Sequence, residues 1–263
     1  MRKKYFNLSF DQIEEKKALE ICREIIRGHK LKSLFFLNAH CFNVAQKNVR
    51  YKQALNSADL ILNDGIGLKL GGYLTGLRIT NNLNGTDLIP KIIEMGIEEN
   101  KKFYFIGSTT ETLRKAKEEL EKKDKNIQIE GVYHGFFTEK DEQYIIDEIN
   151  RKEIDILIVG MGVPKQELWI EKIRKELKTV KLSIAGGAIF DFISQRIKRA
   201  PLWMQKMNIE WIFRLLIEPK RMWKRYLVGN FEFFFKVLYL SFRTKINPKN
   251  TATNKTYPLD ANS

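Results

Sequence analysis

The stretch ILIVGMGVPKQELWI, residues 156–170, indicates the architecture of the chain. Its apolar run, Ile156–Val159, predicts a buried β-strand, and Gly160 and Gly162 permit a sharp turn directly after it. Pro164 suits the first turn of a helix, so a helix is predicted from that point. In such a strand–turn–helix unit the helix N-terminus points toward an anion bound at the turn.

The same alternation recurs through most of the chain. Continuous apolar runs between amphipathic helical stretches are typical of a parallel sheet covered on both faces. We therefore expect an α/β fold, with a doubly wound, mainly parallel, Rossmann-like sheet. Strands are predicted at 34–37, 60–62, 103–106, 127–132, 156–159 and 182–185, and helices near 11–28, 41–54, 85–100, 110–122, 139–151, 165–177 and 187–195.

Residues 196–245 differ in composition from the rest of the chain. They contain twelve Lys and Arg but three Glu, and so carry +9 of the total formal charge of +14. Three of the four Trp residues also lie there. We predict three parts: an α/β catalytic domain at 1–195, a basic, aromatic helical appendage at 196–245, and a disordered tail at 246–263.

The overall composition limits the class of protein. With 43% hydrophobic and 30% charged residues among 263, the chain fits a globular protein. Its positive charge favours an anionic partner, which includes nucleic acid, a phosphorylated ligand and an anionic membrane. No signal-peptide core and no apolar run near the roughly 20 residues of a membrane span are present. Cys22 and Cys41 are expected to be buried apolar side chains in a reducing, cytoplasmic setting.

The predicted strand ends carry polar and glycine residues. Ligands of open α/β sheets bind at the carboxyl ends of the strands, where glycine lets backbone N–H groups approach an anion. These residues are Asn38 after the first strand, Asp64 after the second, Gly107 and Ser108 after the third, Gly160 and Gly162 after the fifth, and Gly186 and Gly187 after the sixth.

Asp64 is the candidate general base. A fixed, partly desolvated carboxylate beside the ligand cleft can accept a proton from a reacting hydroxyl group. Two alternatives are structural. Asp64 could cap the next helix, and the turn at 160–167 could simply pack strand against helix, with Lys165, Gln166 and Glu167 exposed to solvent. The chain has no D-x-D motif and its three His lack metal-ligand spacing, so no metal is predicted. Backbone N–H groups and Arg or Lys would then stabilise a leaving phosphate.

Several motifs occur in a distinctive order. The most specific are the Asp-Gly-Ile-Gly turn at 64–67, the Gly-x-Gly-x-Pro-Lys-Gln-Glu turn at 160–167, and a Glu-Trp…Arg…Glu-Pro-x-Arg…Trp…Arg-Tyr pattern at 210–226. Together with LNAHCFNVA, NGTDL, FYFIGS and GVYHGFF, they resemble the WecG/TagA/CpsF family of bacterial glycosyltransferases over roughly residues 5–240.

This resemblance implies a specific reaction. The family moves a sugar from a UDP-sugar to a polyprenyl-diphosphate-linked acceptor, inverts the anomeric centre, and needs no metal or other cofactor. The protein would then be cytoplasmic, peripheral at the inner face of the cell membrane, and involved in a wall or surface polymer. The donor stays open among UDP-N-acetylmannosamine, its uronic acid, UDP-glucose and another hexose.

The resemblance also assigns residues. It implies Asp64 as the base, Gln166 facing the diphosphate, Asp191 near the uracil and Asn38 beside the sugar or acceptor. One departure is Asn82, at a position where many relatives have Arg. Phe136 or Phe137 would stack on the uracil ring. Arg214, Arg221 and Arg225 would meet the diphosphate when the appendage closes over the site. The remaining predicted UDP-sugar contacts are Thr86, Gly107, Ser108, Gly160, Gly162 and Gly187.

The appendage permits more than one partner. Trp and Phe suit a membrane interface, and each Lys or Arg near anionic lipid adds about 1 kcal/mol. Aromatic residues among basic ones also occur in nucleic-acid-binding proteins, although no recognised motif of that kind is present. A nicotinamide-dependent oxidoreductase would require a full G-x-G-x-x-G unit, which is missing. The apolar face of the appendage fits a second subunit, giving a homo-oligomer, as well as it fits lipid.

Overall fold

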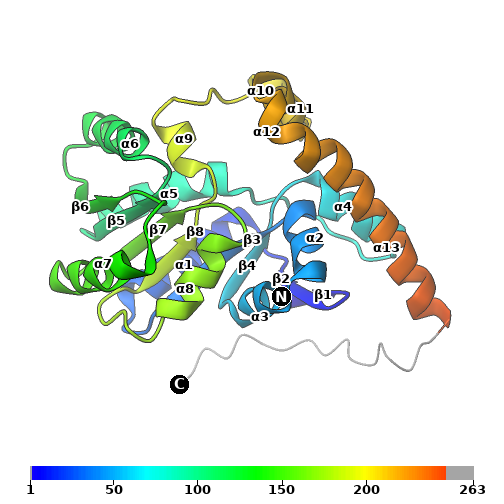
Figure 1. Ribbon diagram of the computed structural model, residues 1–263, viewed down its shortest axis with the longest axis horizontal. Coiled ribbons are helices and arrows are strands. Elements are labelled where there is room, and N and C mark those ends of the chain that lie inside the picture. Colours follow the sequence, from blue (N-terminus) through cyan, green and yellow to red (C-terminus); the bar gives the residue numbers. More distant parts are fainter. Residues whose placement is uncertain (1, 247–263) are drawn as a thin grey trace.

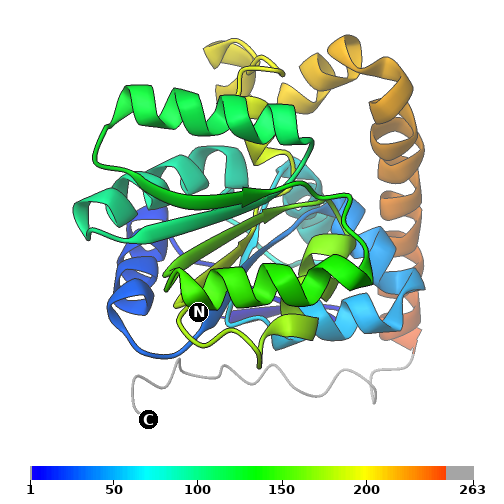
Figure 2. The ribbon, with the colours of Figure 1, turned by 60° about the vertical axis from the view of Figure 1, so that its left-hand side comes forward.

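The computed structural model describes residues 2–246, and the side chains of residues 2–243. Eight strands form one sheet in the order β1-β2-β4-β3-β8-β7-β5-β6, with helices on both faces (Figures 1 and 2). Every pairing except β1 with β2 is parallel, which confirms the predicted doubly wound α/β fold. The strands are β1 (Arg2–Tyr5), β2 (Leu8–Asp11), β3 (Lys32–Leu37), β4 (Leu60–Asn63), β5 (Lys102–Gly107), β6 (Gln128–Tyr133), β7 (Ile156–Gly160) and β8 (Leu182–Ala185).

Two apolar cores explain why the strands read as continuous hydrophobic runs. Successive side chains of a strand point to opposite faces, so Phe35 and Leu37 enter one core while Leu34 and Phe36 enter the other. Helices α2 (Ala39–Lys47), α3 (Val49–Ser57), α7 (Glu139–Arg151) and α8 (Lys165–Ile173) cover the first face, and α1 (Glu15–Arg27), α5 (Gly85–Glu98), α6 (Thr110–Lys123) and α9 (Ile189–Ile193) cover the second.

The N-terminal hairpin was not predicted. Strands β1 and β2 pair antiparallel and add to the edge of the sheet beside β4, so the expected helix at 11–28 begins later, at Glu15. Arg2 pairs with the buried carboxylate of Asp11 at 2.8 Å, and Asp11 Oδ2 accepts a hydrogen bond from Ile61 N. The sequences of β1 and β2, RKKY and LSFD, contain charged and polar residues and lack the continuous apolar run by which the other strands were predicted.

Two helical predictions near the site were also wrong. The predicted helix at 41–54 is two helices, because Asn48 ends α2 and its side chain accepts from Tyr51 N to cap α3. Residues read only as a turn form helix α4 (Ile66–Leu74). Glycine disfavours helix formation, and α4 contains three glycines, so its propensity is low and tertiary packing stabilises it.

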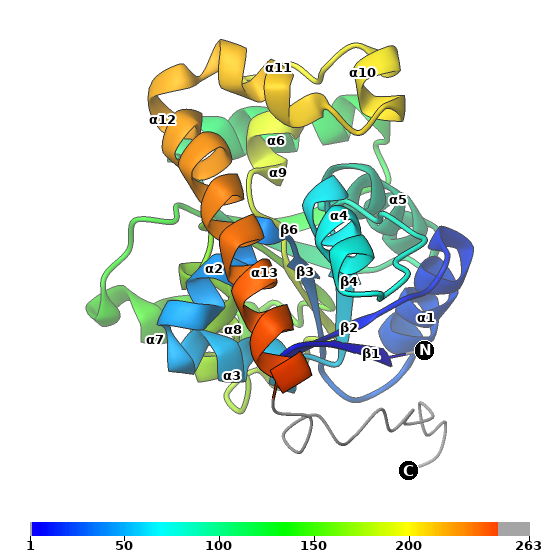
Figure 3. The same ribbon diagram turned by 90° about the vertical axis from the view of Figure 1, so that its right-hand side faces the viewer.

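The predicted appendage is helical (Figure 3). Helix α11 ends before Pro219, as expected for a Glu-Pro step. The last helix extends to Ile246, the first residue of the predicted tail at 246–263. The other residues of that predicted tail lie outside the described residues. The segment consists of α10 (Leu202–Lys206), α11 (Glu210–Ile217), α12 (Pro219–Trp223), a π-helical turn η1 (Lys224–Val228) and α13 (Gly229–Ile246).

Helix α13 packs along α2 and α4 through a seam of buried side chains. Phe233 is fully buried and makes an edge-to-face contact with Phe42, with the ring centroids 5.3 Å apart. Gly71 of α4 approaches so closely that a Cβ atom there would lie 2.8 Å from Phe233 Cζ. Asn43 also donates to Gly229 O at 2.7 Å. This seam fixes the appendage against the α/β body.

The outer face of α13 is apolar and exposed. Phe231, Phe235, Tyr239 and Phe242 expose between 64% and 70% of their surface. Within residues 2–246, no helix combines the length and the hydropathy needed to cross a bilayer.

Candidate active site

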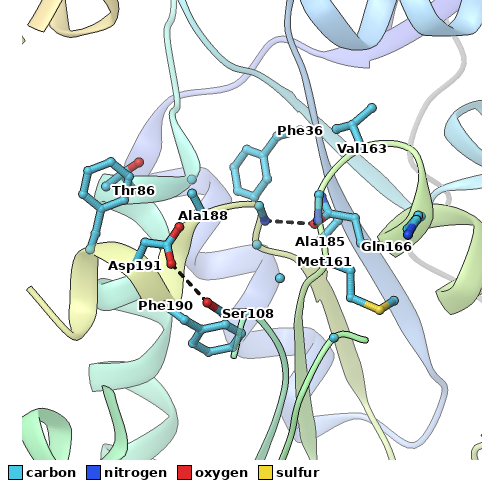
Figure 4. Close-up of a pocket in the computed structure, with 18 of the residues that line it drawn as sticks. Phe36, Thr86, Ser108, Met161, Val163, Gln166, Ala185, Ala188, Phe190 and Asp191 are labelled. Carbon is cyan, nitrogen blue, oxygen red and sulfur yellow. Dashed lines mark hydrogen bonds between the residues drawn. The ribbon is translucent and has the colours of Figure 1, made fainter. Parts of the chain in front are cut away.

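A cavity of about 440 Å³ opens at the carboxyl ends of β3, β4, β5, β7 and β8, with the appendage forming one wall. Figure 4 shows Thr86, Ser108, Gln166 and Asp191 around it. This is the edge of the sheet where ligands of open α/β folds bind. The predicted residues that line the cavity are Asn38, Asp64, Thr86, Ser108, Phe136, Gly160, Gly162, Gln166, Gly187, Asp191, Arg214, Arg221 and Arg225.

Two predicted residues, Gly107 and Phe137, do not line the cavity. Gly107 has φ +140° and lies so close to β7 that a Cβ atom would meet Gly160 O at 2.3 Å. Glycine is therefore needed at this position for the close approach of β5 and β7. Phe137 packs edge-to-face on Trp169, with the ring centroids 5.4 Å apart. Phe136 instead borders the cavity and is 72% exposed. Of the two rings, Phe136 is therefore the one available to stack on a ligand.

The two phenylalanines give a matched test. We expect Phe136→Ala to weaken UDP binding about tenfold without lowering Tm, because stacking a base on an aromatic ring contributes about 1–3 kcal/mol. Phe137→Ala should lower Tm and leave UDP affinity unchanged, because its ring packs on Trp169. Titration calorimetry and thermal unfolding of both variants check this. Loss of UDP binding in Phe137→Ala alone would contradict the assignment.

Asp64 is held in place by Asn38. Asn38 Nδ2 donates to Asp64 Oδ2 at 3.2 Å, while Asn38 Oδ1 caps α2 by accepting from Cys41 N. The half-buried carboxyl group does not cap α4, whose N-cap is Gly65 without a side-chain hydrogen bond. Burial raises the pKa of Asp64, and the hydrogen bond from Asn38 and the charge of Arg225 partly offset this. The result is a fixed carboxylate with increased basicity, suited to a general base.

Asn82 connects the Asp64 turn to the appendage. Its Oδ1 accepts from Gly65 N at 2.6 Å, and its Nδ2 donates to Asn208 Oδ1 at 2.7 Å. Asn208 lies between α10 and α11. The amide at this position therefore holds two backbone segments together. An Arg, as the resemblance leads one to expect here, has only N–H donors and could not accept from Gly65 N.

Three arginines reach the cavity from three consecutive appendage elements. Arg214 comes from α11, Arg221 from α12 and Arg225 from η1. The side chain of Arg214 is 11% exposed and its guanidinium lies 5.1 Å from the Phe192 ring centroid. Nε and Nη2 of Arg214 and Nε of Arg225 have no hydrogen-bond partner among the described residues. Arg214 Nη2 nevertheless lies 3.5 Å from Glu218 Oε2, which leaves the Nε atoms of Arg214 and Arg225 as the donors without an acidic partner among the described residues. Desolvated cationic donors of this kind favour an anionic ligand.

Asp191 lies within reach of the appendage, because its Oδ2 is 3.7 Å from Arg221 Nη1, and its Oδ1 accepts a hydrogen bond from Ser108 Oγ at 3.1 Å. It also pairs with Arg196 Nη2 at 2.9 Å. Arg196 lines the cavity but was counted in the sequence only as part of the basic segment. Its position five residues after Asp191 was the one available signal. Asp191 is thus an acceptor fixed by Ser108 and Arg196.

The Gln166 side chain is held between the glycine turns that follow β7 and β8. Its buried side chain accepts at Oε1 from Gly162 N at 3.1 Å and from Gly187 N at 3.0 Å. Its Nε2 donates to Glu167 Oε1 at 2.9 Å. The amide thus joins the two glycine turns to a buried carboxyl group, and Glu167 is a site residue that sequence reasoning missed.

Thr86 lies at the start of α5, beside the cavity. The N-cap of α5 is Asn84, whose side chain accepts from Asp87 N, so Thr86 does not cap this helix. Within residues 2–246 there is no group of three or more His, Cys, Asp or Glu side chains able to hold a metal ion.

The sequence profile of the glycosyl transferase WecG/TagA/CpsF family matches residues 3–247. The chain belongs to this family. A WecG/TagA/CpsF relative from Bacillus spizizenii, named N-acetylglucosaminyldiphosphoundecaprenol N-acetyl-beta-D-mannosaminyltransferase, is 32% identical over 183 residues, 70% of each chain. A relative of the same name from Bacillus subtilis is 32% identical over 70% of each chain. Another, from Staphylococcus aureus, is 27% identical over 81% of this chain and 84% of the relative.

Family membership confirms the resemblance that the motifs indicated. The glycine turns that suggested a nicotinamide site, and the basic charge that suggested nucleic acid, are features of a WecG/TagA/CpsF glycosyltransferase. Glycosyl transfer is therefore the chemistry to which the residues of the cavity must be related.

Proposed function

We propose that the protein transfers a hexose of the N-acetylmannosamine type from a UDP-sugar to a polyprenyl-diphosphate-linked sugar, with inversion and without a metal ion. The names of the relatives support an N-acetylglucosamine-bearing undecaprenyl diphosphate as acceptor and N-acetylmannosamine as the sugar transferred. The identity of the sugar rests on those names, while the chemistry rests on the cavity.

The observation that carries the proposal is the meeting of one carboxylate with three arginines. Asp64, at the end of β4, shares the cavity with Arg214, Arg221 and Arg225 of the appendage. Asp64 and Arg225 are close enough for the arginine to lower the pKa of the carboxyl group against the effect of burial. A base for the acceptor and cations for the leaving group are the two requirements of a direct displacement at a sugar carbon.

The proposed reaction is a single displacement. Asp64 accepts the proton of the acceptor hydroxyl, whose oxygen forms a bond to the anomeric carbon from the face opposite UDP. The bond from that carbon to the diphosphate oxygen breaks, and UDP leaves with the electron pair. Arg214, Arg221 and Arg225 stabilise the charge that develops on the diphosphate. Inversion follows because attack and departure occur on opposite faces.

The part of the cavity around Phe136 and Asp191, which Arg221 also reaches, suits the uridine. Phe136 offers an exposed ring for stacking, and the Asp191 carboxylate is an acceptor for the uracil N3–H group. Ser108 and Arg196 hold that carboxylate in place. This arrangement would favour a uridine nucleotide over a cytidine nucleotide, because N3 of cytosine carries no hydrogen.

The appendage would bring the enzyme to its lipid-linked acceptor. We propose that the exposed apolar face of α13 and the basic side chains around it dock on the anionic inner face of the cell membrane, which would make the protein peripheral and cytoplasmic. The competing occupant of this face is a second copy of the chain.

A donor panel tests the proposal. Purified protein is incubated with UDP-N-acetylmannosamine, UDP-N-acetylglucosamine or UDP-glucose, with and without a short-chain polyprenyl-diphosphate N-acetylglucosamine, in the presence of EDTA. We expect acceptor-dependent UDP release that is greatest with UDP-N-acetylmannosamine, and a product of inverted anomeric configuration by NMR. Absence of acceptor-dependent UDP release with every donor would refute the proposal.

A further inference from the structure

A group of buried ionisable side chains lies beneath the glycine turns and has no role in the proposed displacement. Glu167 of α8, Cys41 of α2 and Tyr51 of α3 are at most 1% exposed. Glu167 and Cys41 also line the cavity. Among the described residues, the neighbour that hydrogen-bonds to the Glu167 carboxyl group is Gln166, and Glu167 Oε2 has no partner. A buried carboxyl group with an unpartnered oxygen at a ligand cavity calls for an explanation.

The Gln166 carboxamide links this carboxyl group to the two glycine turns. Two N–H groups, from Gly162 and Gly187, point at Gln166 Oε1, so the oxygen must face them and the NH₂ group must face Glu167. Both glycines have positive φ, and a Cβ atom at either would meet no atom within 4 Å. The amide oxygen therefore takes the place at these two N–H groups that an oxygen of an anionic ligand would take.

A diphosphate oxygen that binds the same N–H groups must displace the amide oxygen. If the carboxamide turns over, its NH₂ group faces the diphosphate and its oxygen faces Glu167. A carbonyl oxygen against an ionised carboxylate is repulsive, because neither group has a hydrogen to donate. A protonated carboxyl group donates one, so the turned-over arrangement requires a proton on Glu167.

We propose that Glu167 is a positioning residue that couples donor binding to the uptake of one proton, so that Gln166 turns over and releases Gly162 N and Gly187 N to the diphosphate. The proton comes from the solvent, remains on the Glu167 carboxyl group while the donor is bound, and returns to solvent when UDP leaves. No covalent bond to carbon or phosphorus changes. The inference rests on the proposed function in taking a UDP-sugar as the ligand of this cavity.

The surroundings of Glu167 permit this change near neutral pH. Burial raises its pKa from 4.5 to about 7, with the hydrogen bond from Gln166 acting in the opposite direction. Burial likewise raises the pKa of Cys41 to about 12 and that of Tyr51 well above 10, and Arg225 lowers both slightly. Both neighbours are therefore neutral at neutral pH, and Glu167 is the group of this buried cluster that titrates there.

The pH dependence of donor affinity tests the proposal. Binding of UDP-N-acetylmannosamine is measured by calorimetry between pH 6 and pH 8, because a sugar-diphosphate diester does not itself titrate in this range, whereas UDP does. We expect the Kd of the unmodified protein to rise about tenfold from pH 6 to pH 8, since a ligand that needs one proton on a group of pKa about 7 loses affinity as that proton dissociates. Buffers of different ionisation enthalpy should report net proton uptake.

Glu167→Gln is the informative variant, because its amide can donate or accept without a proton. We expect its Kd to be independent of pH and its proton uptake to vanish. Glu171→Gln, on the same helix and paired with Arg174 outside the cavity, is the matched control and should retain the pH dependence of the unmodified protein. The folded state of Glu167→Gln is checked by Tm at pH 8. We expect it to be higher than that of the unmodified protein, because a carboxyl group with a raised pKa loses its stabilising contribution as pH rises from 4.5 through about 7.

The outcomes are distinguishable. The same pH dependence in Glu167→Gln as in the unmodified protein, or no proton uptake by the unmodified protein at pH 7 to pH 8, would overturn the role of Glu167. No binding of the UDP-sugar to the unmodified protein at any pH would instead contradict the proposed function.

Discussion

Replacement of Asp64 by Asn is expected to lower kcat by about 10²- to 10⁴-fold, the usual contribution of a general base. Asparagine keeps the shape of the side chain and can still accept the hydrogen bond that Asn38 donates, but it cannot take a proton from the acceptor. UDP affinity should change little, because the substitution leaves Phe136 and the arginines in place. Turnover and UDP binding are measured separately, by UDP release and by calorimetry.

The stability of this variant separates chemistry from folding. Burial raises the pKa of the Asp64 carboxyl group above its ordinary value. At a pH above that ordinary value, the ionised carboxylate is therefore less favourable in the folded protein than in the unfolded chain, so Asp64→Asn should not lower Tm at pH 7. Asp147→Asn, at an exposed position on α7, is the matched control and should retain full activity. An equal loss of UDP affinity and turnover in Asp64→Asn would identify Asp64 as a structural residue.

Replacement of Arg225 by Gln should lower kcat by about 10²- to 10³-fold, as does removal of one preorganised donor at a developing anion. Arg225 is half-buried, its Nε has no hydrogen-bond partner, and it lies in the π-helical turn η1. Turns of this kind often occur at functional sites, where they redirect a side chain. The loss should appear mainly in kcat, because the charge on the diphosphate increases as the sugar–oxygen bond breaks.

Lys224→Gln is the matched control for Arg225→Gln. It removes the same charge from the neighbouring position, but Lys224 is exposed, lies against the Trp223 ring and does not line the cavity. With a soluble short-chain acceptor, its kcat should be nearly unchanged. Equal effects of the two variants would contradict a specific role for Arg225.

An NMR titration of His40 gives an independent measurement of the same substitution. Burial and, to a lesser extent, the charge of Arg225 lower the pKa of His40 to about 4, against the opposing effect of Glu232. In Arg225→Gln the pKa should therefore rise, yet stay below its ordinary value of 6.5 because the burial remains. An unchanged His40 pKa would show that the charge of Arg225 does not act on this histidine.

The sequence predicted the parts of the fold and the site that follow from local pattern. Continuous apolar runs gave the parallel strands, and the residues after them include Asn38 and Asp64, which do meet at one edge of the sheet. The break before Pro219 was also predictable from the restriction on the residue that precedes proline.

The features that were missed depend on tertiary contacts. The hairpin of β1 and β2 is stabilised by its pairing with β4, and α4 forms despite three glycines because it packs beneath α13. Spacing alone could not tell which ring of Phe136 and Phe137 faces the cavity, since neighbouring residues differ only in what surrounds them. The orientation of the Gln166 amide likewise depends on N–H groups from two separate turns.

The seam between Phe233, Phe42 and Gly71 bears on the order in which the protein is made. The ribosome completes the α/β body, with Asp64 and the glycine turns, well before it reaches α13. Until Phe233 is seated on that body, the seam does not hold η1, and with it Arg225, over the cavity, although Asn82 and Asn208 can already join the first part of the appendage to the Asp64 turn. The place of Arg225 beside Asp64 would thus be among the last parts of the proposed site to form.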